Sequence, residues 1–479
     1  MSGLIPRRLF INTAAVFAGE GFARLATALM VIVVARRYGP AALGQYGYAV
    51  ACASVLVLVP DFGLHLYVVR ELSAHRDRQR AIFWSVCWVK LILTAGVILF
   101  AVGFGSWGVP DTGRRVLLYL LVGRVILQTF SQVCMAVFKA YEQMHHIALI
   151  QLTNAALVVL WIVAALTLGA SLPVAVAALV AGQIAETWLG WRILRGSFSP
   201  GRPYGWNPEI IRVILVASVP IGITALLQAF SLRIDILVLG FYVSNWALGL
   251  FQAAAWFPVG MYLATSLLMG VLLPKLSRLL RSGQPEGSAY VMGLVKNGLL
   301  LTGLGGLAVW FGAPSLLAWL FGPSSVSALT CLRILVLMLP FVFLNTTLFH
   351  VFVAARQPAV YLGALGLGVT AGLALSFSLT SAYGLLGAAM ADVARELIIS
   401  GAYLFVLVRG EPARHAGRAL LGILVGATVL ITLGYWGAVP LHWGDKWVAA
   451  WMCMVLAGTV LVLGLPNRGE WRLLTDDTL

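Results

Sequence analysis

The sequence predicts an all-α polytopic membrane protein, and three observations carry that prediction. Of 479 residues, 61% are hydrophobic and only 10% are charged, and the mean hydropathy is +0.95. Apolar runs of about 20 residues recur along the whole chain, and each is long enough to cross a bilayer as a helix. Basic residues crowd into alternate loops, which is the positive-inside pattern of membrane proteins.

About 14 transmembrane helices are expected from these apolar runs. In chain order they are placed at residues 10–35, 43–68, 81–104, 114–138, 147–169, 173–194, 212–240, 248–273, 287–311, 327–353, 358–380, 384–408, 418–437 and 447–465. An even number of spans puts both chain ends on one side of the membrane. The basic loops, among them those at 70–80, 192–212 and 275–281, identify that side as the cytoplasm.

Charged positions in the first half of the chain recur about 205–209 residues later. The repeated pairs are Arg24 and Arg233, Lys90 and Lys296, Arg124 and Arg333, Glu186 and Asp392, and the loops at 42–46 and 247–251. A repeat of this length predicts two similar helix bundles facing one polar cavity, as in transporters.

The repeat and the span positions together predict four segments. They are an N-terminal six-helix lobe (1–195), a cytoplasmic linker rich in Gly and Pro (196–211), a C-terminal six-helix lobe (212–409), and helices 13 and 14 with a cytoplasmic tail (410–479). Because each lobe has an even number of spans, the two lobes are expected to be parallel repeats, with the last two helices appended as a hairpin.

Charged side chains inside apolar spans are costly and usually functional. The cations expected to contact substrate are Arg24, Lys90, Arg124, Arg233, Lys296 and Arg333. The acids expected to pair with charges or to couple an ion are Glu20, Glu186, Asp235, Asp392 and Glu396. A surplus of cations suits a phosphate-bearing ligand, which the planar guanidinium binds best. Two alternatives stay open: the charges form structural pairs, or the two lysines snorkel toward the headgroups.

The sequence argues against nucleic-acid binding, metal binding and enzyme activity. The net charge of +15 follows the alternate loops, so it indicates membrane topology and contact with anionic lipid rather than nucleic acid. The histidines lack metal-ligand spacing, and neither a metal nor a cofactor is expected. Because the chain contains no GxxxxGK[ST], HExxH or GxSxG, we expect no ATP hydrolysis and no enzyme activity.

Several short motifs resemble those of the Wzx-type polysaccharide flippases. They are Arg37-Tyr38-Gly39-Pro40, Gly44-Gln45-Tyr46, Asp61-Phe62-Gly63-Leu64, Arg70-Glu71, Lys139-Ala140-Tyr141-Glu142, Arg233-Ile234-Asp235 and Tyr383-Gly384-Leu385-Leu386-Gly387-Ala388-Ala389. These motifs occur in the same order as in that family, and the resemblance covers essentially the whole chain. The resemblance implies membership of the multidrug/oligosaccharidyl-lipid/polysaccharide exporter superfamily, whose members have two six-helix lobes in a V around a central cavity.

The resemblance also implies a substrate and a location. Wzx-type members move polyprenyl-pyrophosphate-linked oligosaccharide from the cytoplasmic to the outer leaflet of the cytoplasmic membrane by alternating access, for surface polysaccharide biosynthesis. The six cations would then line the cavity, with Lys90 and Lys296 nearest the cytoplasm. Membrane lipid is an expected partner, other polysaccharide-assembly proteins are a further candidate, and coupling to H⁺ or Na⁺ stays open.

Three alternative functions remain. A lipid II flippase belongs to the same superfamily and has a similar cationic cavity. A multidrug/cation antiporter of the MATE type would prefer an acidic cavity. A membrane polysaccharide polymerase or ligase would typically carry a large external catalytic loop, and the sequence has none.

Overall fold

The computed structural model describes residues 7–74, 79–109, 111–197, 205–281 and 285–409, and every regular element within these ranges is helical. The chain divides into two compact units, which are described separately below. The predicted spans at 418–437 and 447–465 lie outside the described residues, as do the extreme ends of the chain.

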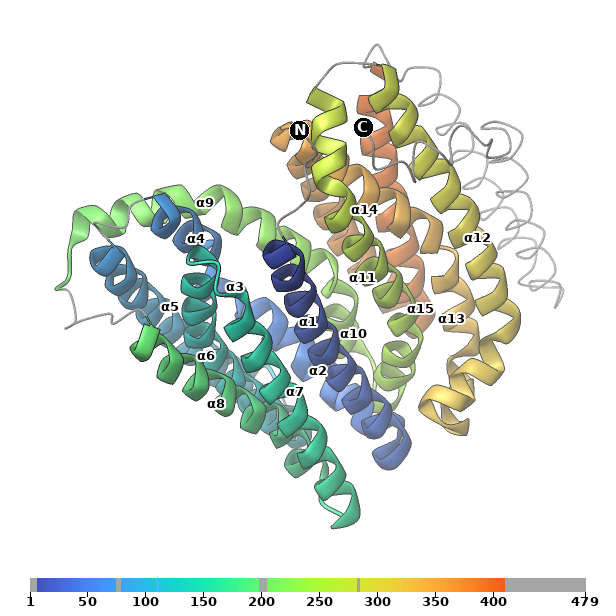
Figure 1. Cartoon of the computed structure of the whole chain (residues 1–479). Coiled ribbons are helices and arrows are strands. Elements are labelled where there is room, and N and C mark those ends of the chain that lie inside the picture. Colours follow the sequence, from blue (N-terminus) through green and yellow to red (C-terminus); the bar gives the residue numbers. More distant parts are fainter. Residues whose placement is uncertain (1–6, 75–78, 110, 198–204, 282–284, 410–479) are drawn as a thin grey trace, which may run out of the picture. The chain divides into compact units, whose positions relative to one another are not determined.

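The first unit comprises Met1–Arg233 together with Ser244–Gly249. Its helices are α1 (Arg7–Val33), α2 (Gly39–Leu56), α3 (Leu58–Asp61), α4 (Leu64–Ala74), α5 (Gln79–Trp107), α6 (Thr112–Ala140), α7 (Met144–Thr167), α8 (Leu172–Ser197) and α9 (Pro208–Ser231). A π-helical turn at Val34–Tyr38 joins α1 to α2 (Figure 1).

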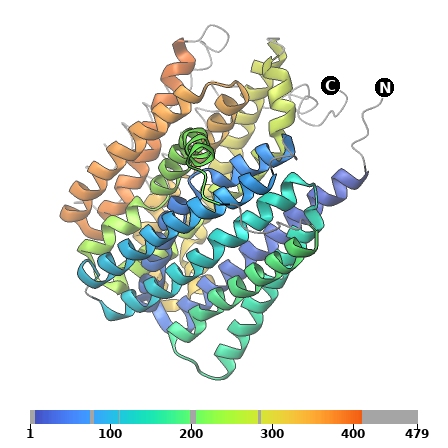
Figure 2. The same cartoon turned by 90° about the vertical axis from the view of Figure 1, so that its left-hand side faces the viewer.

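Within the first unit, α6 packs against α2, α4, α5 and α8, and α7 packs against α1 and α8. Helix α9 contacts α2 to α5 and runs across them; it is seen nearly end-on in Figure 2. Buried apolar residues from α4 to α9 form one core, which includes Leu64, Phe83, Phe138, Leu194 and Ile214. This core fixes α6, the helix that carries Arg124.

The second unit comprises Ile234–Val243 and Leu250–Leu479. Its helices are α10 (Ile234–Tyr242), α11 (Asn245–Arg281), α12 (Pro285–Phe321), α13 (Leu329–Val336), α14 (Leu339–Ala354) and α15 (Pro358–Arg409), with a 3₁₀ segment at Pro323–Ala328. Helix α15 packs against α10, α13 and α14, and α12 packs against α13 and α14. The first turn of α11 belongs to the first unit and the rest of α11 to the second.

The predicted span at 43–68 is divided into three helices. Pro60 has no N–H to donate to the carbonyl one turn earlier, which weakens the helix near Leu56. Phe62 then adopts left-handed backbone angles (φ 30°) and Gly63 a φ of 78°, so α3 ends and α4 starts in a new direction. The expected single helix is therefore wrong at this point.

The predicted span at 212–240 is also divided, between α9 and α10. The amide of Arg233 donates to the carbonyl of Phe230, three residues back, at 3.0 Å. Such a tightened turn ends the α-helical hydrogen-bond ladder. The break places Arg233 at a helix end rather than in the middle of a span.

Two further irregularities fall near predicted boundaries. The span predicted at 327–353 is bent by 47° between Pro323–Val336 and α14, where Pro340 removes a backbone donor. Helix α15 covers the two spans predicted at 358–380 and 384–408. It changes direction at Gly384, whose φ of 56° and ψ of −128° suit glycine alone.

By length and composition, nine helices of the described residues could cross a membrane, or ten if the bent pair forms one span. Two of them, Gly21–Ala74 and Pro358–Leu407, contain 54 and 50 residues. At 1.5 Å per residue each is more than twice as long as the bilayer core of about 30 Å is thick. The chain is thus a multi-pass membrane protein, whereas the count of 14 spans and the four segment boundaries stay predictions.

Candidate functional site

Two of the six predicted substrate-binding cations lie within electrostatic range of the same tyrosine side chain. Arg124 lies in the middle of α6, 12 residues after Thr112 and about 18 Å along the helix axis. Both Arg124 and Arg233 lie within electrostatic range of the hydroxyl of Tyr46, a side chain of α2 that is only 2% exposed. Both arginines are half-buried. The first unit therefore brings two guanidinium groups, one from α6 and one from the turn between α9 and α10, near one tyrosine.

The other two predicted arginines have separate surroundings. Arg24 is exposed on α1. Arg333 on α13 lies over the ring of Trp310 on α12, with its guanidinium carbon 5.2 Å from the ring centroid. This cation–π contact ties α13 to α12.

Both predicted lysines are buried, with 1% of Lys90 and 2% of Lys296 exposed. The ammonium of Lys90 lies 2.8 Å from Oδ1 of Asp61 and donates to the carbonyl of Thr129 at 3.4 Å. The charge of Lys90 is therefore neutralised by a carboxylate at the end of α3. Asp61 had not been expected as a site residue.

The predicted acid of α8, Glu186, is 8% exposed and accepts hydrogen bonds from neutral groups. Ser131 of α6 donates to it at 2.9 Å, and the side-chain amide of Asn154 on α7 donates to its other oxygen. Gln183 donates to Ser131 at 3.1 Å and extends this network. Glu186 has no ion-pair partner among the residues that the structure describes.

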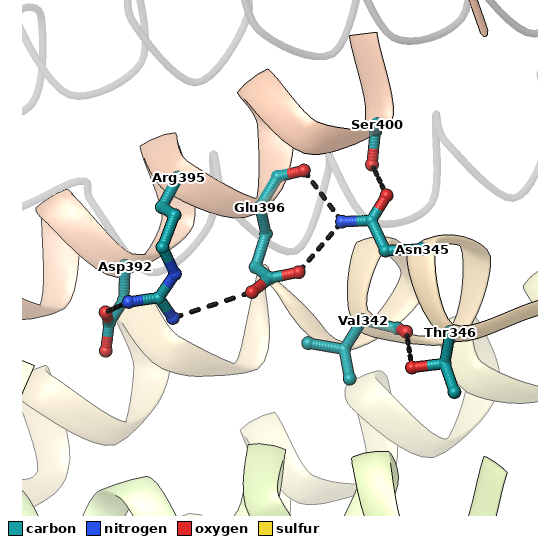
Figure 3. A network of polar contacts seen from close by, with 7 residues as sticks. All are labelled: Val342, Asn345, Thr346, Asp392, Arg395, Glu396 and Ser400. Carbon is teal, nitrogen blue, oxygen red and sulfur yellow. Dashed lines mark hydrogen bonds and ion pairs between the residues drawn. The ribbon is translucent and has the colours of Figure 1, made fainter. Parts of the chain in front are cut away.

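Two of the predicted acids, Asp392 and Glu396, share one polar network in the second unit (Figure 3). On α15, Arg395 lies 2.5 Å from Asp392 and 3.5 Å from Glu396. Asn345 of α14 donates to both the carboxylate and the backbone carbonyl of Glu396, at 2.8 and 2.9 Å. Ser400 donates to the amide oxygen of Asn345 at 2.7 Å and completes the network.

Asp235 of α10 brings a third carboxyl group to this network. It lies close enough to Asp392 for the two carboxyl groups to interact. With all three acids ionised, Asp235, Asp392 and Glu396 against Arg395 would carry a formal charge of −3 + 1 = −2. A net buried charge of this size is costly in a low-dielectric interior.

Two further expectations concern Glu20 and the binding of a metal. Glu20 lies in α1, and the placement of its side chain is outside the described set. Among the described residues no group of three or more His, Cys, Asp or Glu side chains is arranged to hold a metal ion.

Some members of these networks were not predicted as site residues. The spacing of Asp392, Arg395 and Glu396 within four residues of one helix is a signal for a shared face, and it could have identified Arg395. No comparable signal links Asp61 to Lys90, because the pair depends on the break between α3 and α4.

Comparisons with known proteins agree with this architecture. Residues 9–280, more than half of the chain, match the model of a family described as polysaccharide biosynthesis protein. A search of curated proteins gave no match.

Several solved structures share the fold at low sequence identity. The chain is similar to the inward closed conformation of lipid II flippase MurJ, with a TM-score of 0.68 and 13% identity over 95% of this chain and 98% of that one. It is also similar to an inward-facing multidrug resistance MATE family transporter of the MOP superfamily, with a TM-score of 0.64 and 15% identity over 84% and 96% of the two chains. A third similar structure is the eukaryotic MATE transporter AtDTX14, with a TM-score of 0.56 and 13% identity over 86% and 98%.

The family match covers the first unit and the start of the second, and the fold likeness covers nearly the whole chain. The protein therefore belongs to the polysaccharide biosynthesis protein family, within the multidrug/oligosaccharidyl-lipid/polysaccharide exporter superfamily.

Proposed function

We propose that this protein is a flippase that moves polyprenyl-pyrophosphate-linked oligosaccharide from the cytoplasmic to the outer leaflet of the cytoplasmic membrane. Both termini lie in the cytoplasm in this proposal, and the substrate crosses by alternating access. Family membership supports a role in polysaccharide biosynthesis. The fold likeness to flippase and transporter structures supports translocation as the activity.

The observation that carries the proposal is the pair of guanidinium groups at Tyr46. Arg124 of α6 and Arg233, between α9 and α10, both lie within electrostatic range of this buried hydroxyl. Arginine keeps its charge at any physiological pH. A diphosphate offers several oxygens to two planar donors at once, and bidentate contacts of this kind are strong. In this proposal, Arg124 and Arg233 bind the diphosphate while the polyprenyl tail stays in lipid.

The other predicted cations have supporting roles in this proposal. Lys90 and Lys296 receive the diphosphate from the cytoplasmic leaflet, and Arg24 and Arg333 extend the cationic path. Each of these assignments rests on position in the apolar spans.

The membrane potential supplies a driving force for this substrate. Each negative charge that moves outward gains about 2.3 kcal/mol per 100 mV of inside-negative potential. The carboxyl cluster of Asp235, Asp392 and Glu396 supplies a second, coupled route, because loading a proton there relieves buried negative charge. Sodium in place of the proton is the alternative, which an ion-replacement transport assay distinguishes.

Two other substrates are supported by specific observations. Similarity to lipid II flippase MurJ over 95% of the chain supports a peptidoglycan precursor, which carries the same polyprenyl diphosphate anchor. Similarity to MATE transporters supports an antiporter for cationic drugs, but the arginine pair at Tyr46 would repel such a substrate.

Deletion of the gene separates these candidates. We expect deleted cells to accumulate polyprenyl-diphosphate oligosaccharide and to lose surface polysaccharide, as measured by mass spectrometry of extracted lipids and by glycan quantification. Accumulated lipid II with a lytic phenotype would indicate the peptidoglycan precursor. Unchanged lipid pools with new sensitivity to cationic dyes would support the antiporter.

A further inference from the structure

The Lys90–Asp61 ion pair of the first unit is only partly buried. The side chain of Lys90 is 1% exposed, whereas that of Asp61 is 19% exposed. Of the three N–H groups of the ammonium, one faces Asp61 at 2.8 Å and one donates to Thr129 at 3.4 Å. The third finds no acceptor among the residues that the structure describes. The approach to Lys90 from outside therefore passes the carboxylate of Asp61.

Asp61 lies directly before a break in the helical backbone. It is the last residue of α3, a helix of four residues, and the left-handed Phe62 and Gly63 follow it. On the far side of this break, α4 is anchored to α6. His65 of α4 contacts the carbonyl of Gln132 at 3.3 Å through Nδ1.

A second contact of the same histidine secures that anchor. Lys139 of α6 lies 3.3 Å from Nε2 of His65. Because an ammonium can only donate, Nε2 accepts from Lys139, and the tautomer with its proton on Nδ1 donates to Gln132. The two contacts of His65 therefore hold α4 against α6 on the C-terminal side of the break.

We propose that Asp61 holds the place of an anionic ligand group at Lys90, so that a phosphate or diphosphate group and Asp61 compete for the same ammonium. The inference rests on the proposed function, because it takes Lys90 as the first cation that the headgroup meets. In the described structure the pair keeps Lys90 neutralised and buried. An arriving phosphate oxygen displaces Asp61 and gains the third N–H as well, and phosphate carries more acceptor oxygens than the carboxylate it replaces.

The competition predicts opposite effects for the two partners. Removing the competitor should strengthen binding, because the fraction of protein with an available ammonium rises toward one. Asp61→Asn keeps the size of the side chain and removes its charge. We expect it to bind a diphosphate about tenfold more tightly than the natural chain, whereas Lys90→Met should bind it at least tenfold more weakly.

The test uses the full-length protein in lipid nanodiscs, with farnesyl diphosphate, inorganic pyrophosphate and farnesol as probes. The measured quantity is the rise in unfolding temperature with probe concentration, which reports affinity by linkage. Pyrophosphate alone should act if the anion suffices, and farnesyl diphosphate alone should act if the anion must arrive on a lipid. Farnesol, which has no charge, should not distinguish Asp61→Asn from the natural chain.

Glu71→Gln is the matched control variant. Glu71 also pairs with a cation, Arg70, at 3.1 Å, but that arginine side chain is 64% exposed. The variant removes one negative charge from the same region without touching Lys90, so its diphosphate affinity should equal that of the natural chain. An equal gain in Glu71→Gln and Asp61→Asn would show a general charge effect and overturn the inference.

The remaining outcomes separate the inference from the proposed function. If the natural chain binds farnesyl diphosphate and Asp61→Asn binds it equally or less well, Asp61 is a structural partner only and the inference fails. If neither the natural chain nor Asp61→Asn binds a diphosphate while both remain folded, the proposed function fails as well.

Discussion

Charged residues at repeated positions do not share one environment. Glu186 accepts hydrogen bonds from neutral side chains, whereas its repeat mate Asp392 is paired with a buried arginine. Arg333 lies over an indole ring, whereas its mate Arg124 lies within electrostatic range of the hydroxyl of Tyr46. The repeat therefore identifies positions that tolerate charge within apolar helices, but the neighbouring helices decide what each charge does.

Arg124→Ala tests the proposed anion site at the scale of one residue. We expect translocation to fall at least tenfold, because a charge-assisted bidentate contact contributes about 1.5–3 kcal/mol. Arg124→Lys keeps the charge without the planar fork, so it should restore part of the activity. The measurement is recovery of surface polysaccharide in deleted cells that express each variant at equal levels.

A second arginine provides the control for this prediction. Arg192 lies over the ring of Trp188 near the end of α8, with its guanidinium carbon 5.2 Å from the ring centroid. Arg192→Ala removes the same charge from the same unit, and we expect it to leave translocation within about twofold. A loss in Arg192→Ala as large as that in Arg124→Ala would contradict a specific role for Arg124.

The carboxyl cluster of the second unit makes a prediction about stability. Arg395→Met leaves Asp392 and Glu396 buried without their cation, so we expect a loss of about 3–5 kcal/mol in the free energy of unfolding. Adding Asp392→Asn should recover part of that loss, because one of the two uncompensated charges is removed. Chemical unfolding of the three variants in detergent measures this coupling, and strictly additive losses would show that the two residues act independently.

The residue identities of these clusters were predicted better than their partners. Asp235, Asp392 and Glu396 were expected because acids inside apolar spans stand out in the sequence. Asn345 was not expected, because an amide on α14 becomes relevant only when α15 packs beside it. Such pairings depend on tertiary packing, which no local pattern encodes.

At the scale of elements, two glycines at repeated positions lie in direct contact. Gly44 of α2 and Gly249 of α11 are repeat mates, and a Cβ on Gly44 would lie 2.8 Å from the amide nitrogen of Gly249. The carboxylate of Asp111, at the start of α6, accepts hydrogen bonds from both helices: from Gln45 of α2 at 3.4 Å and from Asn245 of α11 at 2.9 Å. Close backbone approach of this kind requires glycine on both sides.

Gly44→Ala should disturb this contact more than an alanine elsewhere. The added methyl group would overlap the backbone carbonyl of Asn245, so we expect destabilisation of about 1–3 kcal/mol. Gly260→Ala on α11 is the control, because a Cβ there meets nothing within 4 Å. The measurement is thermal unfolding of the purified variants, and equal stability of the two would show that α2 and α11 are not in close contact.

The helices were predictable from hydropathy, whereas their breaks were not. An apolar run gives the same hydropathy signal whether it forms one helix or two. The turn at Phe62 and Gly63 was therefore not predicted within the span expected at 43–68. Phe62 is a residue that seldom adopts left-handed angles, and here its ring lies against Gly222 of α9. The break depends on this tertiary contact as well as on Pro60.

At the scale of the whole molecule, family and fold support a membrane transporter with a role in polysaccharide biosynthesis. The family match is to polysaccharide biosynthesis proteins, and the fold is shared with flippases and multidrug transporters. Substrates of opposite charge are served by related architectures, so the fold alone does not choose between them. The choice depends on the side chains, and in our proposal the deciding ones are the guanidinium groups of Arg124 and Arg233.

The most direct test of the central claim is translocation by the purified protein in proteoliposomes. The substrate would be the polyprenyl-diphosphate oligosaccharide extracted from deleted cells, and its appearance in the opposite leaflet would be followed with an impermeant glycan-cleaving enzyme. We expect translocation that requires the protein and is lost in Arg124→Ala. Liposomes that leave this lipid in its original leaflet while taking up a cationic dye would contradict the account.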